Sequence, residues 1–119
     1  MGDLSTNFSR KEFACNCGCG FDTPSPKLIK ALQTLRGITE KSITVTSACR
    51  CIKHNKKVGG KPNSQHLLGT AADIQVSGMT PTRLAVLAEC VPEFAQGGIG
   101  TYATFVHVDV RNGRARWKG

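Results

Sequence analysis

The chain has 119 residues, which is the length of one domain and long enough to bury a hydrophobic core of its own. Hydrophobic residues make up 39% of it, and no apolar run approaches the roughly 20 residues needed to cross a bilayer, so we expect no membrane-spanning segment. Sixteen lysine and arginine residues against eight acidic ones give a net charge of +8, which favours an anionic partner such as nucleic acid, acidic lipid or cell wall.

Two helices are predicted in the first third of the chain. Ser9 and Glu12 fit the S-x-x-E pattern of a capping box, so a short helix should follow Ser9. Residues 14–22 are rich in glycine and cysteine and fit neither regular period, which predicts a loop. Ser25 precedes a proline, and apolar residues then recur at helical spacing, which predicts a helix over 26–38.

The middle of the chain predicts two strands separated by a polar loop. Residues 42–47 alternate polar and β-branched apolar side chains and should form a half-buried strand that ends just before Arg50. Residues 53–64 are polar and glycine-rich, which predicts a surface loop that includes one helical turn. Residues 71–76 predict a buried strand.

The last third predicts one more helix and two strands. Thr80 and the proline after it cap a helix that should continue until the glycine pair at 97–98. Residues 102–110 are rich in β-branched and aromatic side chains and predict a strand. Asn112-Gly113 predicts a hairpin turn into a last strand over 115–117.

These elements together predict one α+β domain over residues 1–119, with an antiparallel sheet and two main helices. The chain shows no internal repeat, linker or low-complexity tract. We expect the domain to be a monomer.

The state of the six cysteines is left open by the sequence. Disulfides would require an oxidising compartment, whereas the absence of a secretory signal favours reduced thiols. A third interpretation is a second, structural zinc ion held by the C-x-C-x-C run together with Cys49 or Cys51, although this run lacks the gap of two to four residues usual between zinc thiolates. The cysteines are Cys15, Cys17, Cys19, Cys49, Cys51 and Cys90.

Two separate stretches supply residues suited to a metal site. His66 and Asp73 are seven residues apart, and Gly69 between them allows the backbone to turn tightly. His107 lies in a β-branched run, with Asp109 two residues later. A catalytic zinc ion needs three protein ligands and one open position, and imidazole nitrogen with carboxylate oxygen is a suitable donor set. We therefore predict a Zn²⁺ ion bound by His66, Asp73 and His107.

The same residues carry a resemblance to a known family. The residues that match the family's pattern are Ser47, Arg50, His54, Asn55, Ser64, His66, Gly69, Ala71, Asp73, His107 and Asp109. Their types and order resemble the zinc peptidases of the D-Ala-D-Ala carboxypeptidase family, which includes phage endolysins and hedgehog signalling domains. The resemblance covers roughly residues 8–117, and its closing segment is most similar to the murein endopeptidase and phage branch. It implies a hedgehog-like zinc peptidase fold, zinc ligation by the three predicted ligands, and substrate binding by Arg50 and Ser64.

The general base is the point where the sequence departs from that family. Its better known members have an acidic residue three positions before the last zinc histidine, where this chain has Thr104. Asp109 projects from the same strand face as His107 and is the nearest acid in sequence. We expect Asp109 either to act as the base or to orient a zinc ligand. His54 and Glu93 are weaker candidates for the base.

The expected function is hydrolysis of a D-amino-acid-containing peptide bond in peptidoglycan stem or cross-link peptides, with Arg50 and Asp109 as catalytic residues. The alternative is a catalytically silent zinc domain that binds cell wall or serves as a phage structural component. A basic nucleic-acid-binding module is a third class, but one tyrosine and one tryptophan provide no stacking platform. We therefore expect peptidoglycan peptides as partners, and neither a specific nucleic acid nor a membrane.

The N-terminal ten residues lack the basic and apolar regions of a secretory signal. We expect the chain to be made in the cytoplasm and to reach the cell wall after phage lysis or as a virion component.

Overall fold

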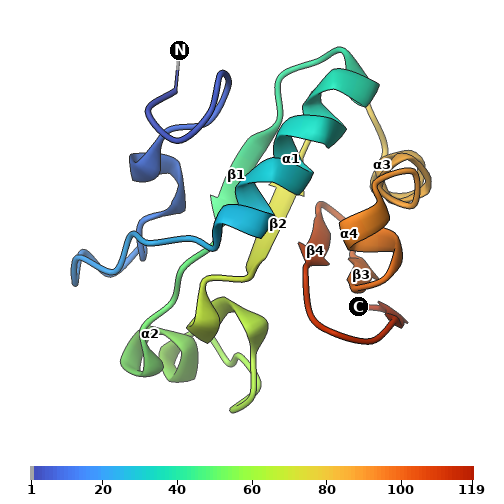
Figure 1. Ribbon diagram of the computed structural model, residues 1–119. Helices are drawn as coiled ribbons and strands as arrows, with labels where there is room; N and C mark the ends of the chain where they lie inside the picture. Colours follow the sequence, from blue (N-terminus) through green and yellow to red (C-terminus); the bar gives the residue numbers. More distant parts are fainter. Residues whose placement is uncertain (1) are drawn as a thin grey trace.

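Five strands form one sheet in the computed structural model, which describes residues 2–119 (Figure 1). Their order across the sheet is β1-β2-β4-β3-β5, and neighbouring strands are antiparallel except β3 and β5, which run parallel. The predicted α+β class is confirmed, with a sheet that is mostly antiparallel. The strands are β1 Thr44–Ser47, β2 Ala71–Gln75, β3 Gly98–Thr101, β4 Val106–Asp109 and β5 Ala115–Lys118.

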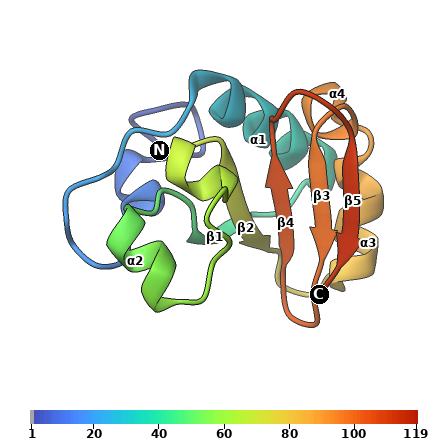
Figure 2. The ribbon, with the colours of Figure 1, turned by 90° about the horizontal axis from the view of Figure 1, so that it is seen from below.

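The helices α1, α3 and α4 gather on one face of this sheet (Figure 2). The main helix α1 begins as predicted, because the Ser25 side chain accepts a hydrogen bond from the backbone N–H of Lys27 and a proline occupies the first helical position. No helix within residues 2–119 is both long and apolar enough to span a membrane. The helical segments are η1 Arg10–Phe13, α1 Pro26–Thr39, α2 Ile52–Lys57, η2 Gln65–Leu68, α3 Pro81–Ala88 and α4 Pro92–Ala95.

The alternation of side chains along β4 separates the core from the opposite face of the sheet. Val106 and Val108 point into the hydrophobic core between the sheet and the helices, and His107 points to the other face. On β2, Ile74 belongs to the same core and Asp73 points away from it. The polar residues of the central strands therefore collect on the side that the main helices leave uncovered.

The predicted hairpin at Asn112-Gly113 is wrong. The last strand, β5, does not pair with β4 but runs parallel to β3, which lies between them. The predicted strand over 102–110 is also shorter, and the glycine-rich segment before it forms β3 instead of a simple break. The glycines of β3 permit close approach: a Cβ on Gly98 would lie 2.3 Å from Asp109 Oδ2, and one on Gly100 would lie 2.4 Å from the Trp117 ring.

Two helical segments also differ from the prediction. The six-residue helix α2 begins at Ile52, one residue before the predicted surface loop over 53–64, and is longer than the single turn predicted there. The helix that begins at Pro81 ends at Ala88, and Pro92 starts the separate helix α4, because a proline lacks the N–H that would continue α3.

Candidate metal centre

The three predicted zinc ligands meet on the face of the sheet opposite the main helices. His66 comes from η2, Asp73 from β2 and His107 from β4, and the last two face each other directly in the strand register. Gly69 adopts a φ of 70°, which turns the chain from η2 into β2 and brings His66 back over the sheet. All three side chains are buried, and their ligating atoms lie within 4.8 Å of one another.

Each imidazole is held by a hydrogen bond on the side away from this meeting point. His66 Nδ1 lies 2.6 Å from the carbonyl oxygen of Ala48, and its Nε2 lies 3.2 Å from Asp73 Oδ1. His107 Nε2 lies 2.7 Å from Asp109 Oδ2, and its Nδ1 lies 3.3 Å from Asp73 Oδ1. One nitrogen of each ring is therefore engaged with a protein acceptor, while the other faces the Asp73 carboxylate.

The spacing of these donor atoms fits a zinc ion. Two ligand atoms bonded to a tetrahedral zinc at about 2.0–2.1 Å lie about 3.3 Å apart. The two histidine-to-Asp73 distances are 3.2 and 3.3 Å. Two imidazoles and one carboxylate are also the donor types of catalytic zinc sites with an open position. His66, Asp73 and His107 would therefore hold the metal.

The charges at this site are coupled through Asp73. Burial tends to raise the pKa of the Asp73 carboxyl, but hydrogen bonds from His107 and His66 outweigh it and lower the pKa to about 2. Burial tends to lower the pKa of His107, but the bonds to Asp109 and Asp73 raise it above its usual value. Protons on His107 and a metal ion therefore compete for the same position, so metal binding should weaken as the pH falls.

Asp109 is completely buried behind His107. Its carboxylate accepts hydrogen bonds from the backbone N–H groups of Gly98 and Arg111, at 2.9 and 3.1 Å, and from the Arg111 guanidinium, with Nη2 at 2.7 Å. Burial tends to raise the pKa of Asp109, but the bonds from His107 and Arg111 hold it well below its usual range. The carboxylate is thus ionised, fully hydrogen-bonded and turned away from the open side of the site.

Arg50 reaches the site from the segment after β1. Its Nη2 donates to Asp73 Oδ2 at 3.2 Å, and the guanidinium also donates to Ser47 Oγ and Asn55 Oδ1. Its backbone N–H donates to the carbonyl oxygen of His66 at 3.1 Å. The predicted substrate-binding arginine therefore lies beside the predicted zinc ligands and forms an ion pair with Asp73.

The three ligands open into a cleft of about 520 Å³. Its charged lining comprises the basic residues Arg50, Lys61 and Arg111 and one acid, Asp73. Ser64 also lines it, and the Ser64 hydroxyl accepts a hydrogen bond from the backbone N–H of His66. A larger hollow of about 640 Å³ lies between the N-terminal segment and α1, but none of the three ligands lines it.

An aromatic wall borders the cleft, and the sequence did not predict it. The rings of Tyr102 and Phe105 stack at a centroid distance of 4.4 Å. The Trp117 ring lies 5.0 Å from the His107 ring, and its Nε1 donates to the Tyr102 hydroxyl at 2.9 Å. The available signal was the clustering of aromatic residues at the ends of the last strands, but only the pairing of β5 with β3 brings Trp117 beside β4.

The other residues considered for the base lie outside the cleft. Thr104 is exposed, and neither it nor His54 or Glu93 lines the cleft. Among the lining residues that the structure describes, the single carboxylate is therefore that of Asp73.

Comparison with known proteins adds an independent finding. A family model described as Peptidase M15 matches residues 6–109, a range that contains the three ligands, Arg50 and Asp109. No curated protein matches the chain.

Proposed function

The chain belongs to the Peptidase M15 family, and on that premise we propose that it hydrolyses a D-amino-acid-containing peptide bond in peptidoglycan stem or cross-link peptides. Members of the family are zinc-dependent metallopeptidases, and His66, Asp73 and His107 are the residues that we assign to the zinc ion. The observation that carries the proposal is the convergence of these three donor groups at the wall of a basic, aromatic-lined cleft.

The cleft suits an anionic peptide. Arg50, Lys61 and Arg111 contribute three positive charges to its lining, against the one carboxylate of Asp73. A peptidoglycan stem peptide carries carboxylates on D-Ala, D-Glu and diaminopimelate, so its charge is complementary to this surface. The stacked rings of Tyr102 and Phe105 offer apolar area for the aliphatic parts of the peptide.

The residues around the ligands take distinct parts in the proposed reaction. When bound, zinc would polarise the scissile carbonyl and make a water molecule acidic enough to attack it near neutral pH. Arg50 retains N–H donors beyond those that bind Ser47, Asn55 and Asp73, and we assign it to a carboxylate of the substrate. Asp109 holds the Nε2 proton of His107 and so directs Nδ1 toward the metal; this makes Asp109 a positioning residue.

A second candidate function is binding of cell-wall peptides without hydrolysis. One observation favours it: Asp73, itself an assigned ligand, is the single acidic side chain among the described lining residues. Attack by water requires a proton acceptor within hydrogen-bond reach, and the buried Asp109 is committed to His107 and Arg111. Under this candidate the chain binds zinc and muropeptides but leaves the peptides intact.

Digestion of purified muropeptides, followed by mass spectrometry, tests the proposed activity. The zinc-loaded protein should release new peptide fragments whose masses identify the bond and distinguish endopeptidase from carboxypeptidase action. His66→Ala should abolish cleavage, and His54→Ala, which removes a histidine outside the cleft, should leave it intact. Uncut muropeptides that still bind to the zinc-loaded protein would reject hydrolysis and support the second candidate.

A further inference from the structure

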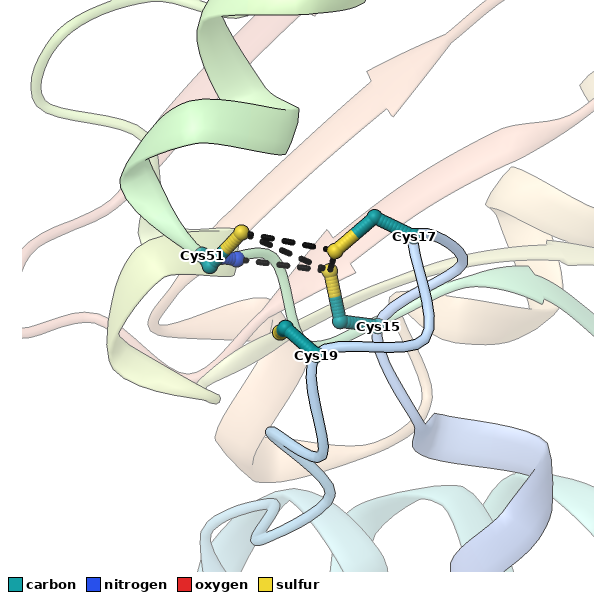
Figure 3. Close-up of side chains that lie close together, drawn as sticks. All are labelled: Cys15, Cys17, Cys19 and Cys51. Atoms are coloured by element: carbon teal, nitrogen blue, oxygen red, sulfur yellow. Dashed lines mark hydrogen bonds between the residues drawn. The ribbon is translucent and has the colours of Figure 1, made fainter.

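Four of the six cysteines meet at a second place in the molecule (Figure 3). Cys15, Cys17 and Cys19 come from the loop after η1, and Cys51 is the residue that precedes α2. All four are free thiols, and their Sγ atoms lie within 4.8 Å of one another. The close-up shows the side chains of Cys15, Cys17 and Cys51 directed toward one another, with Cys19 beside them on the same loop as Cys15 and Cys17.

The distances between the sulfur atoms match a tetrahedral metal site. Sulfur ligands at about 2.3 Å from a tetrahedral zinc ion lie about 3.8 Å apart. Cys15 Sγ lies 3.4 Å from Cys17 Sγ and 3.9 Å from Cys51 Sγ, and the Cys17-to-Cys51 distance is 3.6 Å. These sulfurs therefore already stand at the separations of neighbouring zinc thiolates.

The loop is built in a way that compensates for the short C-x-C spacing. Gly18 has a φ of 80°, a left-handed conformation that reverses the chain between Cys17 and Cys19. The backbone N–H of Cys15 donates to the carbonyl oxygen of Phe21 at 2.8 Å, which closes the loop at its base. A glycine in this conformation lets cysteines separated by one residue converge on a single point.

Backbone N–H groups are directed at two of the sulfur atoms. The N–H of Cys51 lies 3.5 Å from Cys15 Sγ, and the N–H of His54 lies 3.3 Å from Cys51 Sγ. Such donors offset part of the negative charge of metal-bound thiolates and orient them. Neither of the remaining cysteines belongs to the cluster: Cys49 is buried in the hydrophobic core, and Cys90 is exposed on the α3 side of the molecule.

From these contacts we propose that Cys15, Cys17, Cys19 and Cys51 bind a structural zinc ion as four thiolates. Four protein ligands fill a tetrahedral zinc and leave no open position, so this site has no hydrolytic role. Its effect is mechanical: it ties the loop after η1 to the residue that follows Arg50. The second zinc ion therefore fixes the segment that carries Arg50 into the cleft.

Elemental analysis of the protein purified under reducing conditions tests the proposal. The wild type should contain about two zinc ions per chain, and the His66→Ala/His107→Ala variant should keep about one, held by the cysteines. Cys17→Ser/Cys19→Ser should lose this ion, and the matched variant Cys90→Ser should lose none. A His66→Ala/His107→Ala protein without zinc would overturn the proposal whatever the fate of the peptidase activity.

Cobalt provides a readout that does not depend on stability of the cysteine variants. The His66→Ala/His107→Ala protein loaded with Co²⁺ should show thiolate-to-cobalt charge-transfer absorption and the d–d bands of a tetrahedral ion. Absence of these bands, or an intact mass lower by the hydrogens of disulfides among the four cysteines, would overturn the proposal. The double histidine variant lacks two of the three ligands at the peptidase site, so this outcome is separate from failure of the proposed function.

Discussion

The carboxylate of Asp109 is fully buried against His107, with its Oδ2 2.7 Å from the imidazole Nε2 and on the opposite side of the ring from Asp73. Arg111 clamps the same carboxylate through its guanidinium, which prevents Asp109 from turning toward the cleft. The contact between Asp109 and His107 therefore leaves Nδ1, and not Nε2, of this β-strand histidine facing the proposed metal site.

Replacing this carboxylate should weaken metal binding more than it disturbs the fold. Asp109→Asn keeps the size of the side chain but loses the charge that fixes the His107 tautomer, so zinc affinity at the histidine site should fall about 10- to 100-fold. Competition with a chromophoric chelator measures it, with Glu40→Gln as the matched control at an exposed position. If activity disappears while zinc affinity is unchanged, Asp109 acts as the base and is not a positioning residue.

The stability of the metal-free protein should depend on pH through the same pair. The lowered pKa of Asp109 stabilises the fold above its unfolded value of about 3.9, and this contribution is lost as the pH falls through the folded-state pKa. The raised pKa of His107 stabilises the fold below its unfolded value of about 6.5, and this contribution is lost as the pH rises through the folded-state pKa.

The stability difference between wild type and Asp109→Asn should therefore be largest between about pH 4 and pH 6.5. Urea unfolding of both proteins in chelator, across this range, measures the difference. A difference that stays constant from acid to neutral pH would contradict the coupling of the two groups.

Arg50 should affect substrate binding and leave the metal in place. Arg50→Ala removes the donor assigned to a substrate carboxylate, so KM should rise roughly 10- to 100-fold, the cost of a lost charged hydrogen bond. Arg50→Lys should recover little of the substrate binding that Arg50→Ala loses, because an ammonium group cannot form the bidentate contact with a carboxylate. Steady-state kinetics with zinc analysis provides both readouts, and Arg83→Ala at an exposed position of α3 should change neither. Loss of zinc in Arg50→Ala would instead indicate that its bond to Asp73 supports the ligand.

Trp117 should report metal binding by fluorescence. It is the one tryptophan in the chain, and its ring lies 5.0 Å from that of His107. Cobalt bound at the histidine site should quench its emission, and the quenching should be much weaker in His66→Ala. Equal quenching in both proteins would show that cobalt reaches Trp117 from another site.

A single methyl group in β3 should test how tightly Asp109 is enclosed. The added Cβ of Gly98→Ala would lie 2.3 Å from Asp109 Oδ2, which should destabilise the fold by about 1–3 kcal/mol. Gly37→Ala in α1 meets no atom within 4 Å and should stabilise by about 0.5–1 kcal/mol, because alanine favours the helix. Thermal unfolding distinguishes the two, and a neutral Gly98→Ala would refute the close packing.

The sequence was sufficient to predict the elements that are determined by residues close together in the chain. Ser25 and the proline after it set the start of α1, alternation predicted β1, and a short apolar run predicted the buried strand β2. Two of the three proposed metal ligands could be proposed from the sequence for the same reason, since His66 and Asp73 belong to one short turn-and-strand segment with a characteristic pattern.

The tertiary structure decided what depends on pairing between distant segments. The glycine pair at 97–98 predicts a break when only its neighbours in sequence are considered, because the close approach that the β3 glycines permit involves Asp109 and Trp117, which come later in the chain. The same pairing placed β5 parallel to β3 and so put Trp117 beside His107. From the sequence, either Cys49 or Cys51 could join the C-x-C-x-C run. In the folded chain Cys49 is buried in the hydrophobic core, and Cys51 lies beside the sulfur atoms of the run. Residue types and their spacing thus indicated which kinds of site the chain could form. Burial and contacts between distant segments, which exist only in the folded chain, decided which side chains lie at each site.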